Sequence, residues 1–224
     1  MQHTNGSVIV GGVDEAGRGS IIGPLVVAGI SFKKSAISEL RKIGVKDSKA
    51  LTSKSRICLY AQLKEMANSI CVYKINCNVI DDNVYLKRLN KLEAKMMARV
   101  INNLHADEVH VDSCDVNSDR YEHCIRSYLP TVNPKLRSMH HADRTNTVVS
   151  AASIVAKVTR DQEIEKIRKT HCNIGSGYPC DNKTMGFIRE WISKYRYPPT
   201  FARKSWRPLR QMLEKIDQCK LDQF

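Results

Sequence analysis

The sequence predicts an α/β domain followed by a helical C-terminal region. Short apolar segments rich in β-branched residues come early in the chain, and apolar residues at helical spacing dominate later. That order is typical of a sheet covered by helices. The chain has 224 residues, which is long enough to bury a core without disulfides or metal. We therefore expect one large domain with a small helical extension.

The N-terminal third predicts strands. Residues 7–13 and 24–32 are apolar and are joined by a glycine-containing turn at residues 17–19, so we expect them to pair antiparallel. Thr52 or Ser53 can cap a helix that reaches residue 67. Further strands are expected over residues 69–79 and 108–112.

Apolar stripes at helical spacing predict the helices of the rest of the chain. The clearest stripe includes Met96 and Met97, which we interpret as core residues. Phe187 and Trp191 are also spaced to face one helix side and are expected in a core. We expect helices over residues 83–104, 121–128, 147–169, 184–195 and 205–217.

Charge is the most informative feature of the composition. The chain has 36 Lys and Arg against 23 Asp and Glu, a formal net charge of +13. Such an excess favours a polyanionic partner, first of all a nucleic acid, although a solvated basic surface gives the same number. The longest mostly apolar run, residues 21–30, is too short to cross a bilayer, so we expect no membrane association.

The eight cysteines do not form a zinc-binding pattern, because no C-x-x-C pair occurs. The N-terminus has no basic region before its short apolar stretch, so we expect no secretory signal and a cytoplasmic location. Reduced thiols follow from that expectation, with Cys58 and Cys71 filling a core.

Four carboxylates come from three segments that end predicted elements. Asp14 and Glu15 close the first strand, Asp112 closes the strand at 108–112, and Asp143 lies in a polar stretch before a small-residue helix. Neighbouring residues of a regular strand point to opposite faces, so Asp14 and Glu15 can share a site only if the strand ends or bulges there. An ordinary polar turn also explains an isolated Asp-Glu pair.

A divalent cation would reconcile these carboxylates with one another. If they converged alone, they would repel and raise each other's pKa values. Mg²⁺ suits a site of few carboxylates, water and phosphate. Two such ions about 4 Å apart would activate a water and stabilise the leaving oxygen in phosphodiester cleavage.

Five ordered sequence blocks resemble one family, ribonuclease HII (type 2 ribonuclease H), in its archaeal form. The resemblance covers about residues 7 to 210. The blocks are Asp14-Glu-Ala-Gly-Arg-Gly19 with Ile22-Gly-Pro-Leu-Val-Val-Ala28, Val45-Lys-Asp-Ser-Lys-Ala-Leu51, Val148-Val-Ser-Ala-Ala-Ser-Ile-Val-Ala-Lys-Val-Thr-Arg-Asp161, Gly175-Ser-Gly-Tyr-Pro179 and Pro198-Pro-Thr-Phe-Ala-Arg-Lys-Ser-Trp206.

The resemblance implies a ribonuclease H-like fold, with a five-stranded mixed sheet flanked by helices and a helical C-terminal extension. It implies a catalytic domain over residues 1–170, a substrate-binding extension over 171–217 and a tail over 218–224. The implied activity is cleavage of the RNA strand of RNA/DNA hybrids and of duplex DNA on the 5′ side of single embedded ribonucleotides. Cleavage leaves 3′-hydroxyl and 5′-phosphate ends and serves ribonucleotide excision repair and RNA primer removal. We expect a monomer.

The resemblance also assigns site residues. Asp14, Glu15, Asp112 and Asp143 match the metal-binding carboxylates, which would hold two Mg²⁺ or Mn²⁺ ions. The turn Gly17-Arg18-Gly19 matches the turn that reads the ribonucleotide, where glycines let the backbone approach the 2′-hydroxyl and Arg18 can contact phosphate.

Further substrate contacts are expected outside this turn. Tyr178 matches a tyrosine that stacks on sugar beside the ribonucleotide, although a tyrosine in a Gly-Pro loop needs no such role. A buried helix explains Ser153 as well as a substrate contact does. The candidate phosphate contacts are Ser48, Lys49, Lys157 and, in the basic C-terminal region, Arg203, Lys204 and Arg207.

The last seven residues carry a possible partner motif. Gln218, Leu221 and Phe224 have the spacing of the peptide that binds the sliding clamp PCNA, which usually contains a second aromatic residue. Such a tail would order on binding. An ordinary amphipathic helix end explains the same residues, and both interpretations stay open.

Two other functions compete with the ribonuclease. An inactive nucleic-acid-binding protein would be expected to lack a carboxylate, yet all four are present. A different two-metal nuclease or phosphodiesterase would not need the Gly17–Gly19 turn together with Tyr178. Equal cutting of all-DNA duplexes would favour that second alternative.

Overall fold

The computed structural model describes residues 7–45, 51–130 and 134–221. The chain divides into two compact units, and each of them gathers three separate segments. The first unit contains Met1–Ala16, Val26–Tyr73 and Asn90–Thr159; the second contains Gly17–Leu25, Lys74–Leu89 and Arg160–Phe224. The second unit thus also includes Gly17–Leu25, Lys74–Leu89 and residues 160–170, which the sequence analysis assigned to the catalytic domain.

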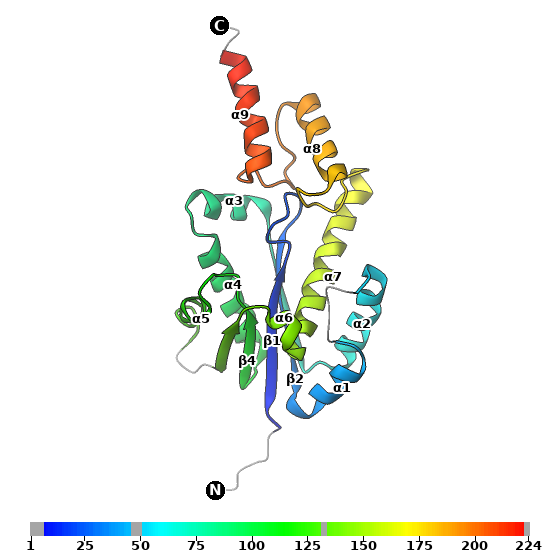
Figure 1. Cartoon of the computed structure of the whole chain (residues 1–224), viewed down its shortest axis with the longest axis vertical. Coiled ribbons are helices and arrows are strands. Elements are labelled where there is room, and N and C mark those ends of the chain that lie inside the picture. Colours follow the sequence, from blue (N-terminus) through cyan, green and yellow to red (C-terminus); the bar gives the residue numbers. More distant parts are fainter. Residues whose placement is uncertain (1–6, 46–50, 131–133, 222–224) are drawn as a thin grey trace. The chain divides into compact units, whose positions relative to one another are not determined.

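Strands and helices alternate through the first two thirds of the chain, and helices alone follow (Figure 1). In chain order the elements are β1 (Ile9–Ala16), β2 (Leu25–Lys33), the 3₁₀ helix η1 (Lys34–Ala36), α1 (Ile37–Lys42), α2 (Ser53–Met66), β3 (Ser69–Ile75), α3 (Cys77–Tyr85), α4 (Leu89–Leu104), β4 (Glu108–Asp112), α5 (Ser118–Arg126), β5 (Lys135–Met139), α6 (Ala142–Thr145), α7 (Thr147–Thr170), α8 (Asn182–Tyr195) and α9 (Arg207–Leu221).

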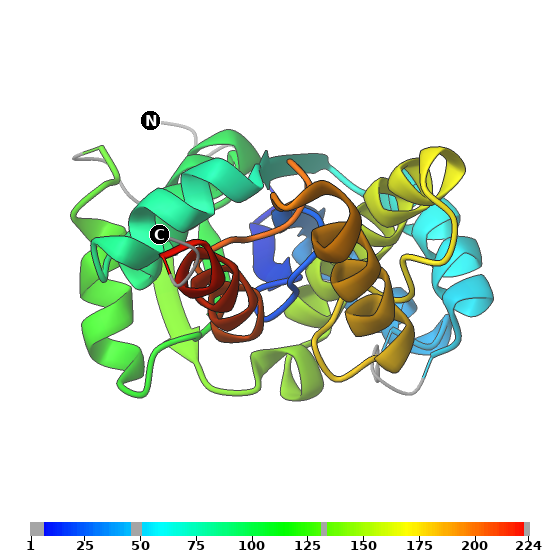
Figure 2. The ribbon, with the colours of Figure 1, turned by 90° about the horizontal axis from the view of Figure 1, so that it is seen from above.

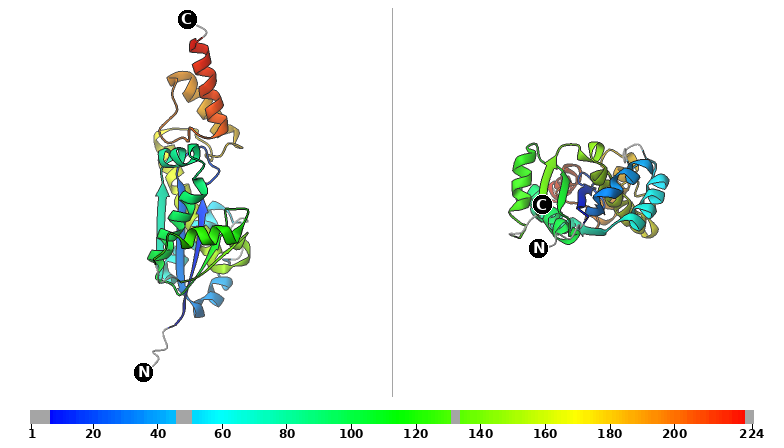
Figure 3. Two further views of the ribbon diagram at one scale, coloured as in Figure 1. Left: turned by 90° about the vertical axis from the view of Figure 1, so that its left-hand side faces the viewer. Right: turned by 90° about the horizontal axis from the view of Figure 1, so that it is seen from below.

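The described strands form one five-stranded mixed sheet in the order β3-β2-β1-β4-β5. β1 pairs antiparallel with β2 and parallel with β4, and β4 pairs parallel with β5. The left view of Figure 3 shows the strands running side by side. The predicted fold class and the predicted antiparallel pairing of the first two strands are therefore confirmed.

Helices cover both faces of the sheet in the first unit, as the views along the strands show for α2 and α5 (Figure 2; Figure 3, right). On one face, residues of α1, α2 and the start of α7 share a core with Val26, Ala28 and Ile30 of β2. On the opposite face α4 approaches so closely that a Cβ atom on Gly29 would lie 2.4 Å from Val100.

A glycine also permits the approach of α7. A Cβ atom on Gly12 would lie 2.1 Å from the carbonyl oxygen of Val148, near the start of α7, so no larger residue fits there. The small apolar residues that open α7 are buried, as the sequence predicts for this helix. The close packing holds the start of α7 against the strand that carries Asp14.

The second unit has its own core, which includes Ile21, Ile164, Ile188 and Leu209. Phe187 packs against this core, and Trp191 lies within an aromatic cluster with Phe187, so the sequence-based interpretation of this helix face agrees with the structure.

A polar link joins α3 to the segment before α9 within the second unit. The carboxylate of Asp81 is almost fully buried. It accepts hydrogen bonds from the backbone N–H groups of Lys204 and Ser205 at 2.9 and 3.0 Å, and from the Ser205 hydroxyl at 2.5 Å.

Three local predictions were wrong. The expected strand over residues 69–79 ends at Ile75, because Asn76 is the N-cap of α3, which begins at Cys77. The expected helix over residues 83–104 is two helices, and Leu86 is 58% exposed where the chain turns between them. Cys58 is exposed rather than part of a core.

Seven cysteines are free thiols in the structure, namely Cys58, Cys71, Cys77, Cys114, Cys124, Cys172 and Cys180. Within the same residues, the length and apolar character that crossing a bilayer requires are not combined in any helix.

Candidate active site

Asp14 and Glu15 lie near the end of β1 in unbroken strand geometry. The antiparallel register with β2 continues through both residues to Ala16, so the strand neither ends nor bulges between them. Regular alternation therefore directs their side chains to opposite faces of the sheet. Asp14 is buried and accepts a hydrogen bond from Ser153 of α7. The backbone N–H of Glu15 donates to Oδ1 of Asp14 at 2.7 Å.

Glu15 belongs to a separate buried polar group on the side of α4 and α5. Burial raises the pKa of the Cys114 thiol, and the charges of Glu93 and Glu15 raise it further. The Cys114 thiol donates to the buried carboxylate of Glu93 at 3.1 Å. The pKa of Tyr121 is raised by burial first and then by these same neighbours.

Asp112 ends β4, beside the end of β1. Val13 and Val111 are partners in the parallel pairing of these strands, so Asp14 and Asp112 follow them at the same edge of the sheet. The half-buried carboxylate of Asp112 accepts a hydrogen bond from the backbone N–H of Ala142 at 2.7 Å. That bond connects β4 directly to the residue before Asp143.

Asp143 lies in the short helix α6, which begins after a residue in the left-handed conformation, His141. Its side chain is buried, with 3% of its surface exposed. The hydroxyl of Ser150, from the start of α7, donates to the backbone carbonyl of Asp143. α6 is thus fixed to both β4 and α7 within the first unit.

The charges of Asp112 and Asp143 act on Asp14. Burial raises the pKa of Asp14 to about 7, and the charges of Asp112 and Asp143 raise it as well, while the hydrogen bonds from Ser153 and the Glu15 N–H oppose the shift. A charged Asp14 is therefore costly in this setting without a compensating cation.

The donor set fits a hard divalent cation that substrate and water complete. Within the described part of the chain, no three His, Cys, Asp or Glu side chains form a ready-made ligand group. The burial of Asp14 and its repulsion by Asp112 and Asp143 are nevertheless the kind of penalty that a cation relieves. Mg²⁺ commonly uses one or two carboxylates and takes its other ligands from water and phosphate.

The turn that follows β1 belongs to the second unit. Gly17 has φ 84°, and a Cβ atom there would lie 2.8 Å from the carbonyl oxygen of Pro24, so glycine is required. The N–H of Ser20 donates to the carbonyl of Gly17 at 3.2 Å and closes the turn. Gly19 is exposed, with open space around the position of a Cβ atom. Another molecule could approach the backbone there closely.

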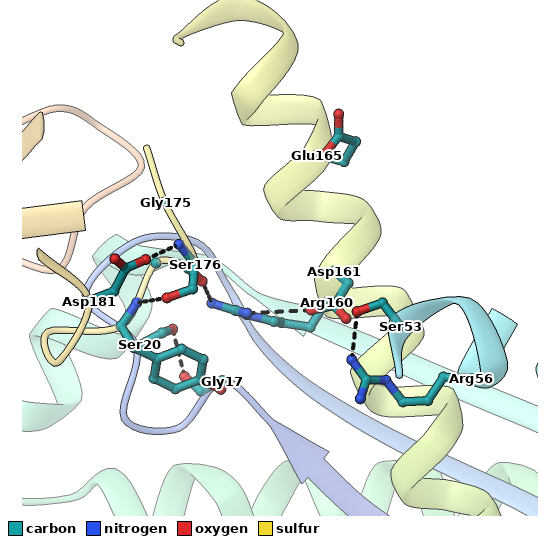
Figure 4. A network of polar contacts seen from close by, with 12 residues as sticks. Gly17, Ser20, Ser53, Arg56, Arg160, Asp161, Glu165, Gly175, Ser176 and Asp181 are labelled. Carbon is teal, nitrogen blue, oxygen red and sulfur yellow. Dashed lines mark hydrogen bonds and ion pairs between the residues drawn. The ribbon is translucent and has the colours of Figure 1, made fainter. Parts of the chain in front are cut away.

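The loop that carries Tyr178 is built in the same unit around Arg160 of α7 (Figure 4). Arg160 is almost fully buried and donates to the carbonyl of Ser176 at 2.5 Å. Its guanidinium lies 4.5 Å from the centroid of the Tyr178 ring. Ser176 is held a second time by Asp181, whose carboxylate accepts a hydrogen bond from the Ser176 N–H at 2.6 Å.

One backbone carbonyl joins this loop to the turn after β1. The carbonyl oxygen of Gly177 accepts from the N–H groups of Ile21 and Ile22 at 2.8 and 3.1 Å. The turn and the tyrosine loop therefore form one assembly within the second unit.

Comparison with known proteins decides which family has this arrangement. The family model described as Ribonuclease HII matches residues 11–208. The chain belongs to the ribonuclease HII family. It is a ribonuclease H endonuclease, of the kind that cleaves the RNA strand of RNA/DNA hybrids.

Archaeal members of the ribonuclease HII family are similar over nearly the whole chain. A ribonuclease HII of Cenarchaeum symbiosum (strain A) is 47% identical over 203 residues, which cover 91% of this chain and 97% of that protein. The crystal structure of ribonuclease H2 from Pyrococcus horikoshii OT3 has a TM-score of 0.88 and 37% identity, and covers 94% of this chain and all of that chain. The structure of the PCNA:RNase HII complex from Archaeoglobus fulgidus has a TM-score of 0.82 and 34% identity, with 89% and 96% covered.

The structure corrects one predicted substrate contact, that of Arg203 with a phosphate. Arg203 is fully buried and cannot reach a phosphate, because its guanidinium is occupied by backbone carbonyls of the second unit. Its neighbour Lys204 is exposed.

The other expected contacts of this ribonuclease HII are placed as follows. Lys157 is half-buried on α7, in the first unit. Arg207 is exposed at the start of α9, and so is Gln218 near its end. Ser48, Lys49 and Phe224 lie outside the described residues, as does the side chain of Leu221.

Arg160 is the functional candidate that the sequence reasoning missed. It stands in the block around residues 148–161 that resembles ribonuclease HII, but no role was assigned to it. A basic residue in a helix that turns from apolar to charged is expected on the surface. Its burial depends on partners 16 to 18 residues later in the chain, and local periodicity does not reveal them.

Proposed function

We propose that this ribonuclease HII also cuts duplex DNA on the 5′ side of single embedded ribonucleotides, leaving 3′-hydroxyl and 5′-phosphate ends. The observation that carries the proposal is that Asp14, on the strand that leads into the Gly17–Gly19 turn, is acted on by the charges of Asp112 and Asp143. Such an activity would serve ribonucleotide excision repair and the removal of RNA primers.

Asp14, Asp112, Asp143 and Glu15 would hold two divalent cations, Mg²⁺ or Mn²⁺. When bound, these ions would supply an activated water and stabilise the leaving oxygen of the scissile phosphodiester. The chain itself fixes the ligands. Ser153 and the N–H of Glu15 orient Asp14, and the N–H of Ala142 orients Asp112. Rotation of Glu15 or a change in the end of β1 on substrate binding would complete the set.

The turn of residues Gly17–Ser20, hereafter the reading turn, would recognise the ribonucleotide. Its exposed backbone at Gly19 lets a 2′-hydroxyl approach closely, and this group distinguishes RNA from DNA. Arg18 is half-buried and would contact a phosphate. Tyr178, supported on one side by Arg160, would stack on the sugar next to the ribonucleotide.

Basic side chains would hold the duplex through its phosphates without reading sequence. Ser48, Lys49, Lys157 and Lys204 are the proposed contacts, and the net charge of +13 supports a polyanionic substrate. This contribution to affinity would weaken with added salt.

A sliding clamp is the proposed protein partner. A ribonuclease HII from Archaeoglobus fulgidus, 34% identical to this chain, forms a complex with PCNA. Gln218, Leu221 and Phe224 would enter the clamp's hydrophobic pocket. Gln218 is exposed in the structure, which suits this role.

The decisive experiment uses a DNA duplex that carries one ribonucleotide, with Mg²⁺ or Mn²⁺ added separately. An all-DNA duplex and EDTA serve as controls. We expect a single cut 5′ of the ribonucleotide, and no product in either control. Equal cutting of the all-DNA duplex would indicate a different nuclease. Binding without cleavage in both metals would contradict the proposal.

A further inference from the structure

Arg203 is fully buried in the second unit, and its guanidinium donates several hydrogen bonds there. Its side chain is 0% exposed. Nη1 donates to the carbonyl of Arg18 at 2.8 Å, and Nη2 donates to the carbonyl of Gly17 at 2.7 Å. Nη2 also reaches Oγ of Ser20 at 2.9 Å, and Nε reaches the carbonyl of Gly23 at 3.2 Å. All these acceptors belong to the reading turn or the residues directly after it.

A guanidinium in this position is expensive for the fold. A buried charge is costly unless hydrogen bonds replace its water, and here backbone carbonyls do so. Burial lowers the pKa of Arg203 to about 10, so the side chain stays charged at neutral pH. An apolar residue would fill a core more simply. The planar guanidinium has five N–H donors, so a role that requires hydrogen bonds to several carbonyls at once explains an arginine here.

The bonds to Arg203 determine where the opposite side of each peptide group points. The peptide bonds of the described residues are trans, so a carbonyl and the N–H of the next residue point in opposite directions. The carbonyls of Gly17 and Arg18 point toward the guanidinium. The N–H groups of Arg18 and Gly19 consequently point away from it.

Trp206 extends the same arrangement by one residue. Its indole N–H donates to the carbonyl of Gly19 at 3.3 Å. The guanidinium of Arg203 lies 4.8 Å from its ring centroid. Arg203 and Trp206 together hold three successive carbonyls of the reading turn from behind, and both come from the short segment before α9.

We infer that Arg203 is a positioning residue for ribonucleotide recognition: it holds the carbonyls of Gly17 and Arg18 inward and so presents the N–H groups of Arg18 and Gly19 to the substrate. The inference rests on the proposed function of the reading turn. Two fixed N–H donors suit a hydroxyl oxygen or a phosphate oxygen, whereas a turn free to rotate its peptide groups would favour neither. Arg203 itself touches no substrate.

The test measures binding, with cleavage suppressed by the substitution Asp14→Asn in every protein. Dissociation constants are determined for two duplexes of one sequence, one with a single ribonucleotide and one of DNA alone. Arg203→Lys keeps the charge but loses the planar guanidinium. We expect it to reduce the preference for the ribonucleotide by about tenfold or more, with little change in affinity for DNA alone.

Ile188→Val is the matched control, because it trims a buried core residue of the same unit that lies outside the reading turn in sequence. It should lower thermal stability and leave the preference unchanged. Trp206→Phe is the second variant, which keeps an aromatic ring but loses the bond to Gly19. It should reduce the preference by a smaller factor, and this result keeps the inference testable if Arg203→Lys does not fold.

Three outcomes would overturn the inference, and they are distinguishable. If the Asp14→Asn protein itself shows no preference for the ribonucleotide, the proposed function of the turn fails and the inference fails with it. If that protein prefers the ribonucleotide and folded Arg203→Lys or Trp206→Phe prefers it equally, only the positioning role is wrong. An equal loss of affinity for both duplexes would also contradict it.

Discussion

The backbone N–H of Ala142 donates a hydrogen bond to Oδ1 of Asp112, with the two atoms 2.7 Å apart. This bond spans 30 residues of sequence and joins the end of β4 to the helix that carries Asp143. It occupies Oδ1 of the Asp112 carboxylate and fixes the direction of that side chain. Two of the candidate metal ligands are thus positioned by a single contact of the backbone with a side chain.

Asp112→Asn should abolish cleavage while leaving substrate binding nearly intact. An amide oxygen can still accept from Ala142, so the local structure should persist, but the neutral group binds a cation poorly. We expect kcat to fall by about a thousandfold or more, because the metal chemistry supplies most of the rate. Cleavage assays and binding titrations of the same duplex measure the two quantities.

Asp115→Asn is the matched control for this substitution. Asp115 follows Asp112 closely in sequence and is buried. Its carboxylate accepts hydrogen bonds from Asn90, Asn117 and Arg120. It should cost stability and spare kcat. Near-normal turnover of Asp112→Asn at saturating Mg²⁺ would refute the ligand assignment.

Asp14 should make the metal-free protein less stable as pH rises. Its pKa is about 7 in the folded protein and 3.8 when unperturbed, so between these values the folded state keeps a proton that the unfolded state has lost. Stability therefore falls from about pH 4 to about pH 7, and stays low above it.

Asp14→Asn removes this titration. In EDTA at about pH 8 the variant should be more stable than the unsubstituted chain by on the order of 2–4 kcal/mol, and the difference should vanish near pH 4. Urea unfolding at both pH values measures it. A variant that is less stable at the higher pH would show that burial and the neighbouring charges do not raise the pKa of Asp14.

Sequence patterns predicted the elements whose burial is regular along the chain. α7 was expected over residues 147–169 and runs from Thr147 to Thr170, since a long run of small apolar residues leaves few alternatives. The break after α3 was not predictable in this way. Leu86 continues the apolar spacing into α4, and Lys87, a residue type that rarely signals a turn, adopts φ 55° there.

The candidate site also contains residues that local sequence patterns predict and residues that they do not. The carboxylates stand at the ends of apolar strands, where residue type and position already indicate chemistry. Arg203 looked like a surface residue because it lies in a basic segment, and its partners are 180 or more residues away in sequence. The grouping of Gly17–Leu25 with the C-terminal residues in one compact unit is equally non-local. No periodicity in a single segment encodes such contacts.

Phe224→Ala should weaken binding to the sliding clamp by about thirtyfold or more without affecting cleavage. The proposed peptide depends on Leu221 and Phe224 filling an apolar pocket, and loss of one aromatic anchor commonly costs about 2 kcal/mol or more. Calorimetric titration of the full chain into the clamp measures the affinity. Lys220→Ala, between the motif positions, is the control and should bind normally. Equal affinity of the two variants for the clamp would mean that the tail is an ordinary helix end and not a clamp-binding peptide.

Tyr178→Ala should reduce cleavage of a single embedded ribonucleotide more than cleavage of a long hybrid. The half-buried ring of Tyr178 lies 4.5 Å from the Arg160 guanidinium, which supports one of its faces. Loss of one stacking contact is worth roughly 1–3 kcal/mol, or about 5- to 150-fold in kcat/KM. A long hybrid offers other registers, so its cleavage should fall by only a small factor.

Tyr195→Ala is the control. Tyr195 is an exposed tyrosine of the same unit that packs on Trp191, and its loss should affect cleavage of neither substrate. Equal losses on the two substrates would mean that Tyr178 supports the loop rather than the junction.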